Sequence, residues 1–163
     1  MSITANKRLT NELYNNLIPK YKNININYEM NKAIVTIKNV EIIISDYYPF
    51  RAPDVKINNL PYSYFIIPQN SAKINKIIHE NNIFNNKCIC CSSIIKNSVH
   101  LWAPKYGIID IMAEIDKINI VKQKVKYIIA IDNIQKSISD RIKQSIPTDI
   151  ELLILEYIID VRN

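Results

Sequence analysis

The spacing of apolar residues changes along the chain, and this change constrains the fold more than any other feature of the sequence. From Thr4 to about Leu17 apolar residues recur every four positions, which predicts a helix with one buried stripe and Thr4 as its N-cap. Between Ile24 and Ile44 apolar and polar residues alternate instead. This alternation predicts short antiparallel strands, with a turn at residues 30–32.

Two prolines interrupt the pattern at residues 47–53, Tyr-Tyr-Pro-Phe-Arg-Ala-Pro. Each proline lacks an amide donor and restricts the residue before it, so we expect a rigid loop there. A further strand is predicted at residues 55–57, and helical spacing at residues 71–82 predicts a helix of about three turns.

Helical spacing dominates the remainder of the chain. It marks a helix from Ile108 to Ile118 and resumes from about Val121 to Ile142, and Pro147 begins a last predicted helix. Because strands and helices occupy separate blocks, the predicted fold class is α+β and not an alternating parallel sheet.

Length and composition indicate one folded domain over residues 1–163. Two cores within 163 residues would each be small, and a hydrophobic content of 48% with 22% charged residues is ordinary for a folded chain.

No apolar run is long enough to cross a bilayer, and the N-terminus lacks a signal-peptide core. The three cysteines cluster at residues 88–91, unlike a secreted disulfide framework, so we expect a reducing compartment, the cytoplasm or nucleus.

The formal net charge of +6 permits binding to acidic partners. Lysines and arginines are scattered and form no block interleaved with aromatic residues, so nucleic-acid binding is not expected. The abundance of isoleucine, asparagine and lysine indicates an AT-rich genome, such as that of a large DNA virus or a parasite.

Three segments carry a resemblance to a known family. Residues 7–13, Lys-Arg-Leu-Thr-Asn-Glu-Leu, residues 46–55, Asp-Tyr-Tyr-Pro-Phe-Arg-Ala-Pro-Asp-Val, and residues 102–104, Trp-Ala-Pro, occur in this order. They resemble the first helix, the proline loop and the Trp-Ser-Pro segment of the E2 ubiquitin-conjugating enzymes. The resemblance covers residues 1–120 and implies a UBC-like fold: an N-terminal helix, an antiparallel β-meander and C-terminal helices, divergent over residues 121–163.

The resemblance also implies a thioester chemistry. In the family a cysteine accepts ubiquitin or a related modifier from an E1 activating enzyme, and a lysine amine then attacks the thioester. Cys90 is the predicted nucleophile, with Cys88 and Cys91 as alternatives. Asn82, at the family's spacing before Cys90, is the predicted oxyanion donor, although the chain has no intact His-Pro-Asn motif and a solvated loop asparagine is the alternative.

Contacts with an E3 ligase are implied at the two proline-bearing loops and on the first helix. The corresponding residues are Lys7, Arg8, Pro49, Phe50, Ala103 and Pro104. The alternative is that Phe50 closes the core. For Trp102 we expect packing beneath the loop.

Three other interpretations remain open. The same scaffold could serve as a non-catalytic binding module, comparable to inactive E2 variants and RWD domains, or as a structural component of a larger, viral assembly. A zinc site is the third, from the ligands His79, Cys88, Cys90, Cys91 and His100. Their spacing is poor for zinc, so we expect no metal and no cofactor.

Overall fold

The computed structural model describes residues 1–66, 72–83, 91–96 and 98–142. The chain divides into two compact units, Met1–Lys122 and Gln123–Asn163. The elements in chain order are α1 (Ile3–Glu12), η1 (Leu13–Leu17), β1 (Ile24–Glu29), β2 (Lys32–Ile37), β3 (Val40–Ser45), β4 (Asp54–Ile57), β5 (Leu60–Pro61), α2 (Tyr62–Phe65), α3 (Ala72–Glu80), α4 (Ser98–Leu101) and α5 (Ile108–Ile142).

Helix α1 continues into a π-helical turn, η1. Its buried stripe is the predicted one, Ala5, Leu9, Leu13 and Leu17. The predicted N-cap, Thr4, is wrong: the Ser2 hydroxyl accepts the N–H of Ala5 at 3.3 Å, so the helix begins earlier. Ser2 Oγ also donates to the carbonyl of Asp46 at 2.8 Å, which ties the start of α1 to the chain just after β3.

The strands form one antiparallel meander in the order β1-β2-β3-β4-β5. The predicted strands and the turn between β1 and β2 are present, although Lys32 already belongs to β2. Strand β5 was not predicted, because two residues are too few to show alternation. The α+β class is therefore confirmed.

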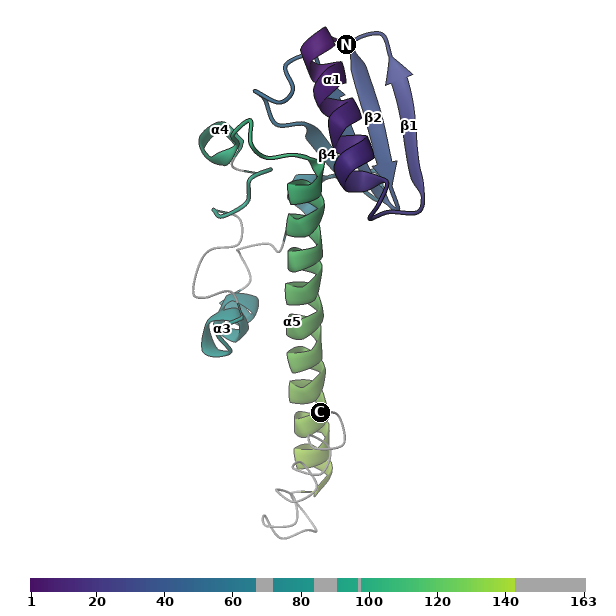
Figure 1. The fold of residues 1–163 in the computed structure, drawn as a ribbon. Coiled ribbons are helices and arrows are strands. Elements are labelled where there is room, and N and C mark those ends of the chain that lie inside the picture. The colour runs from purple at the N-terminus through teal and green to yellow at the C-terminus, as the bar shows by residue number, and fades with distance from the viewer. Residues whose placement is uncertain (67–71, 84–90, 97, 143–163) are drawn as a thin grey trace. The chain divides into compact units, whose positions relative to one another are not determined.

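One face of the sheet is buried under α1 (Figure 1). The register brings Ala33, Val35 and Ile37 of β2 opposite Ile44, Ile42 and Val40 of β3, and all six side chains are buried. The first turns of α5 add to the core of this unit through Ile108, Ile111, Met112, Ile115 and Ile118. The outer face carries the half-buried alternate residues, among them Ile34 and Ile43.

Helix α5 joins the two helical stretches that the spacing predicts. It runs without interruption from Ile108 to Ile142, because no glycine or proline lies between these residues to end it. Helix α3 lies within the predicted segment 71–82. The helix predicted at Pro147 lies outside the described residues. Within the described ranges, no helix has the length and apolarity that a membrane span requires.

Candidate functional site

The Glu12 carboxylate joins three parts of the first unit. Its side chain is buried, with the residue only 4% exposed. Glu12 Oε1 accepts the hydroxyl of Tyr48 at 2.6 Å and the Nε–H of Arg8, and Oε2 accepts the N–H of Ile108 at 2.8 Å. Burial of a carboxylate is costly unless it is paired and hydrogen-bonded, and here a guanidinium and a helix N-terminus supply both. The carboxylate therefore fixes α1, the proline loop and the start of α5 to one another.

Gly107 is required by this arrangement. A Cβ atom at position 107 would lie 2.7 Å from Glu12 Oε2, closer than Cβ atoms come to other heavy atoms, so the loop or the carboxylate would have to shift. The N–H of Gly107 donates to Asp110 Oδ2 at 2.8 Å, which caps the first turn of α5. The single glycine of the chain thus lies where the loop passes directly over the buried carboxylate.

The charges of this cluster reinforce its hydrogen bonds. Burial, and next the negative charge of Glu12, raise the pKa of Tyr48 well above its usual value, so the phenol remains a donor. Burial lowers the pKa of Arg8, but the hydrogen bond and charge of Glu12 outweigh it and the net change is upward. Arg8 Nη2 also donates to the carbonyl of Tyr106 at 3.4 Å. The half-buried Arg8 is therefore engaged within the fold, whereas Lys7 is exposed.

A hydrogen bond joins the two proline-bearing loops that the sequence singles out. Trp102 Nε1 donates to the carbonyl of Pro49 at 2.7 Å. The Trp102 ring packs with its centroid 6.3 Å from that of Tyr48 and 6.0 Å from that of Tyr106. The structure thus places Trp102 against Tyr48 and Pro49 of the proline loop, although Trp102 and Pro49 lie 53 positions apart in the sequence.

The loop residues differ in exposure, and this difference separates those that pack within the fold from those that face solvent. Pro49 is buried and Ala103 is half-buried, while Pro104 is exposed. Phe50 is 73% exposed, so the interpretation that it closes the core is wrong. Tyr48 occupies that place, with 1% exposure. We call Lys7, Phe50 and Pro104, the exposed members of the predicted set, the docking edge.

A second carboxylate, Glu114 on α5, anchors the segment that follows the cysteines. Glu114 Oε1 accepts the hydroxyl of Ser93 at 2.5 Å and that of Tyr62, and Oε2 accepts the N–H of Ile94 at 2.8 Å. Burial, and next the hydrogen bond to Glu114, raise the pKa of Tyr62 well above its usual value. Residues 93–94 are therefore held against α5 at Glu114.

The predicted nucleophile, Cys90, and its neighbour Cys88 lie outside the described residues. Cys91 is described and exposed. Beside the anchored segment lies a cavity of about 280 Å³, lined by Ser92, Ser93, Ile94, Tyr106, Asp110, Ala113, Glu114, Lys117 and Ile118. Tyr106 belongs to this lining and also packs on Trp102, so it lies between the cavity and the Trp102 ring.

Asn82, the predicted oxyanion donor, is exposed in the turn after α3. Its backbone has φ +47°, and its N–H donates to the carbonyl of His79 at 3.1 Å. Asparagine adopts this left-handed conformation more readily than most residues. The observed conformation agrees with a solvated turn asparagine, the alternative to the catalytic interpretation.

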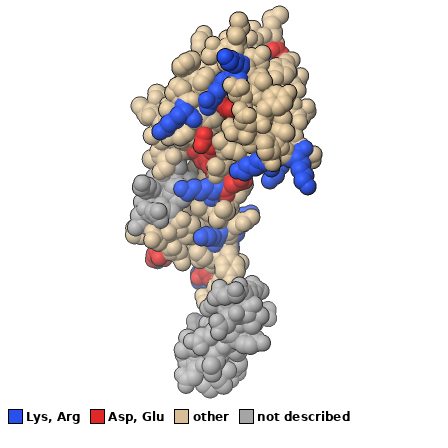
Figure 2. Space-filling model, viewed as in Figure 1, with Lys and Arg blue, Asp and Glu red and all other residues tan. Residues whose placement is uncertain are grey.

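The remaining charges do not form a dominant patch on the face in view. Figure 2 shows blue and red side chains interspersed over that face. Among the residues that the structure describes, no group of three histidine, cysteine or acidic side chains could hold a metal ion. Cys88 and Cys90, two of the five candidate zinc ligands, lie outside that part of the chain.

Comparisons with known proteins give no relative to set beside this geometry: no family model, curated protein or solved structure matches the chain. The arrangement therefore has to be interpreted from its own residues. Glu12 and Glu114 were not among the predicted site residues. Each lies within or beside an apolar helical stripe, and a carboxylate at such a position is a signal that could have identified both.

Proposed function

We propose that the chain is an E2-like protein, which carries ubiquitin or a related modifier as a thioester on its cysteine cluster and transfers it to a lysine. The observation that carries the proposal is the hydrogen bond from Trp102 to Pro49, which holds the two proline-bearing loops together and leaves Phe50 exposed. This arrangement supports a docking point for a ligase at the proline loop.

The docking edge has the properties of a low-cost binding surface. The loops that carry Phe50 and Pro104 are tied to α1 nearby, through the bonds of Tyr48 and Ile108 to Glu12, which lowers the conformational entropy lost when a partner binds. Phe50 supplies an apolar anchor, and Lys7 supplies a positive charge for an acidic partner. We expect Phe50→Ala to weaken binding of such a partner more than Lys7→Ala does.

The chemical step needs only a thiolate and two acyl exchanges. The thiolate attacks the thioester carbonyl of the modifier on the activating enzyme, whose cysteine leaves as a thiolate. The neutral amine of the acceptor lysine then attacks the new thioester and forms an amide; the carbon–sulfur bond breaks, the sulfur of this chain leaves as a thiolate, and the proton lost by the amine passes to solvent. The three hydrogen bonds to Glu114 would keep the C-terminal flank of the cysteine cluster in place during both steps.

The decisive experiment is a charging assay. The full chain is incubated with activating enzyme, ATP and ubiquitin, and the products are separated without reducing agent. We expect an adduct that reducing agent removes, lost in Cys90→Ser and retained in Cys88→Ser and Cys91→Ser. Retention in Cys90→Ser with loss in one of the other two variants would reassign the nucleophile.

A non-catalytic binding module is the second candidate. The exposed turn that holds Asn82 favours it, because an asparagine on a solvated turn is not a preorganised oxyanion donor. No adduct with ubiquitin or any related modifier, together with binding of a ligase domain that Phe50→Ala abolishes, would establish this candidate and exclude the first.

A further inference from the structure

The outer face of the sheet carries a groove that the docking edge does not use. A hollow of about 480 Å³ lies between β3, β4 and the chain at residues 51–54, 61–63, 95, 96 and 98. A second hollow of about 490 Å³ lies beside it, and both are lined by Ile43, Arg51, Ala52 and Asp54. The two hollows therefore adjoin at these residues, and we call them together the sheet groove.

One end of the sheet groove is positively charged. Arg51, Lys56 and Lys96 line that end, with Asp54 as the acidic side chain among the lining residues. The register places Glu41 opposite Lys56 on the neighbouring strand. Within the described part of the chain, however, none of the three cations lies within ion-pair distance of a carboxylate, so their charges remain available to a ligand.

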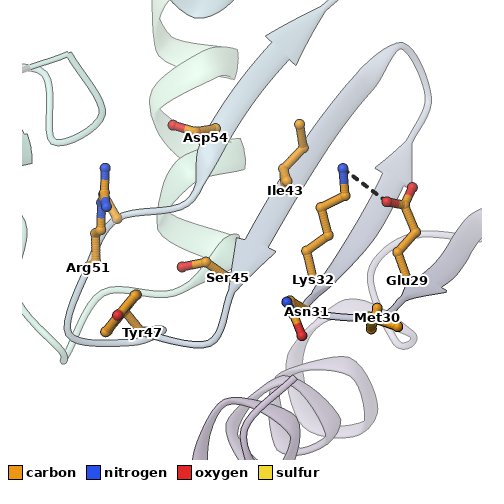
Figure 3. A pocket seen from close by; sticks show the side chains of 10 residues that line it. Glu29, Met30, Asn31, Lys32, Ile43, Ser45, Tyr47, Arg51 and Asp54 are labelled. Atoms are coloured by element: carbon orange, nitrogen blue, oxygen red, sulfur yellow. Dashed lines mark ion pairs between the residues drawn. The ribbon is translucent and has the colours of Figure 1, made fainter.

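The other end is close to neutral. Figure 3 shows Lys32 and Glu29 together on one side of this hollow, with Ile43 and Ser45 of β3 between them and Arg51. The ion pair of Lys32 and Glu29, at 2.9 Å, neutralises itself. The preference for an anion is therefore confined to the end that carries Lys56 and Lys96.

The floor of the sheet groove is apolar. Ile43 and Ile95 are half-buried and Pro53 is buried, so a ligand would cover apolar surface while its charged groups meet the cations at the rim. The side chain of Tyr62 at the cationic end is buried. The exposed aromatic side chain among the lining residues, Tyr47, belongs to the other hollow and does not line the end with Lys56 and Lys96. The cationic end therefore has no exposed aromatic among its described lining residues on which nucleic-acid bases would stack.

We propose that the sheet groove binds an extended, acidic segment of a partner protein. Apolar side chains of that segment cover Ile43 and Ile95, and its carboxylates pair with Arg51, Lys56 and Lys96. An extended segment fits because alternate side chains along a strand point to opposite sides, so one row can lie on the floor while the other faces solvent and the rim. The inference does not depend on thioester chemistry or on the docking edge.

The test uses a synthetic fluorescein-labelled peptide of alternating glutamate and valine, and fluorescence anisotropy with the full chain. We expect binding that Lys56→Glu/Lys96→Glu weakens by about tenfold or more, because two attractive charge contacts become repulsive. Raising the salt concentration from about 0.05 M to about 0.5 M should weaken the wild-type complex as well. A matched peptide with glutamine in place of glutamate should bind at least about tenfold more weakly.

Lys22→Glu/Lys126→Glu is the matched control, since it changes the net charge equally at two exposed lysines outside the sheet groove. It should bind the peptide within about twofold of wild type. Lys56→Gln/Lys96→Gln, which keeps the length of both side chains, replaces the glutamate variant if circular dichroism shows that the latter is unfolded. Absent wild-type binding, equal binding of the glutamine peptide, unchanged binding by the groove variant, or displacement of the peptide by a single-stranded oligonucleotide at lower concentration would each overturn the proposal.

Discussion

Glu12 and Glu114 both collect hydrogen bonds from loops distant in sequence, but their surroundings differ. Glu12 is almost fully buried and its donors include a guanidinium, whereas Glu114 is half-buried and its donors are two hydroxyls and one backbone amide. A buried charge with a charged partner is strongly destabilising when the pair is broken. A half-buried carboxylate with neutral donors can be replaced in part by water.

This comparison assigns the two carboxylates different tasks. Glu12 lies where α1, the proline loop and the start of α5 meet, so its loss should affect the whole first unit. Glu114 holds the short segment at Ser93 and Ile94, so its loss should act mainly on the flank of the cysteines. The arrangement of α1, the proline loop and the start of α5 therefore depends on Glu12, and the position of Ser93 and Ile94 depends on Glu114.

The largest expected effect is that of Glu12→Ala. The substitution leaves the hydroxyl of Tyr48, the N–H of Ile108 and the Arg8 guanidinium without their acceptor. We expect the free energy of unfolding to fall by about 3 kcal/mol, measured by urea denaturation. Glu29→Ala, which removes an exposed carboxylate, is the control and should cost about 0.5 kcal/mol or less. Equal losses in the two variants would contradict the role of Glu12.

Gly107→Ala tests the same cluster by steric conflict instead of lost hydrogen bonds. The added methyl group would meet the Glu12 carboxylate at 2.7 Å, so either the loop or the side chain must move. We expect a cost of about 1–3 kcal/mol. In the double variant with Glu12→Ala the second cost should be much smaller, because the conflicting atoms are gone. Additive costs in this double-mutant cycle would show that Gly107 is needed for another reason.

Glu114→Ala should have a more local effect than the changes at the Glu12 cluster. We expect a loss of about 1–2 kcal/mol in the free energy of unfolding, because Glu114 is half-buried and water entering at its position can replace part of its hydrogen bonds. The amide of Ile94 should lose much of its protection against hydrogen exchange, while the amides of β2 and β3 keep theirs. Uniform loss of protection over the sheet would remove the distinction between the two carboxylates.

Much of the first unit could be predicted from sequence spacing alone. Alternation over β2 and β3 is undisturbed, and each alternate residue faces the core as predicted. The stripe of α1 was equally clear, but its N-cap was not, because Ser2 and Thr4 are both good caps and only the bond to Asp46 favours Ser2. Local propensity could not decide between them.

The site was less predictable, for physical reasons. The sequence singled out Trp102 and Pro49 separately, but their hydrogen bond joins residues 53 positions apart, and no local pattern contains such a contact. The exposure of Phe50 and the burial of Tyr48 could not be predicted either. Side chains in an irregular proline loop follow no helical or strand period, so the sequence does not indicate which of two nearby aromatic residues faces the core. The sheet groove depends on Lys56 and Lys96, which are brought together only by the fold.

Alkaline pH should lower the free energy of unfolding through both carboxylate clusters. This is the smallest of the expected effects and the simplest to measure. The pKa values of Tyr48 and Tyr62 are raised, so these phenols stay protonated in the folded chain at a pH at which unfolded tyrosines ionise. Folded protein then binds more protons than unfolded protein, and stability is present below pH about 10 and lost as the pH rises further. Each tyrosine should contribute a slope of at most about 1.4 kcal/mol per pH unit, measured by urea denaturation between pH 9 and about pH 11. Tyr48→Phe and Tyr62→Phe should each remove about half of the slope that the two share; a slope unchanged in both variants would mean that neither phenol is held protonated by its carboxylate.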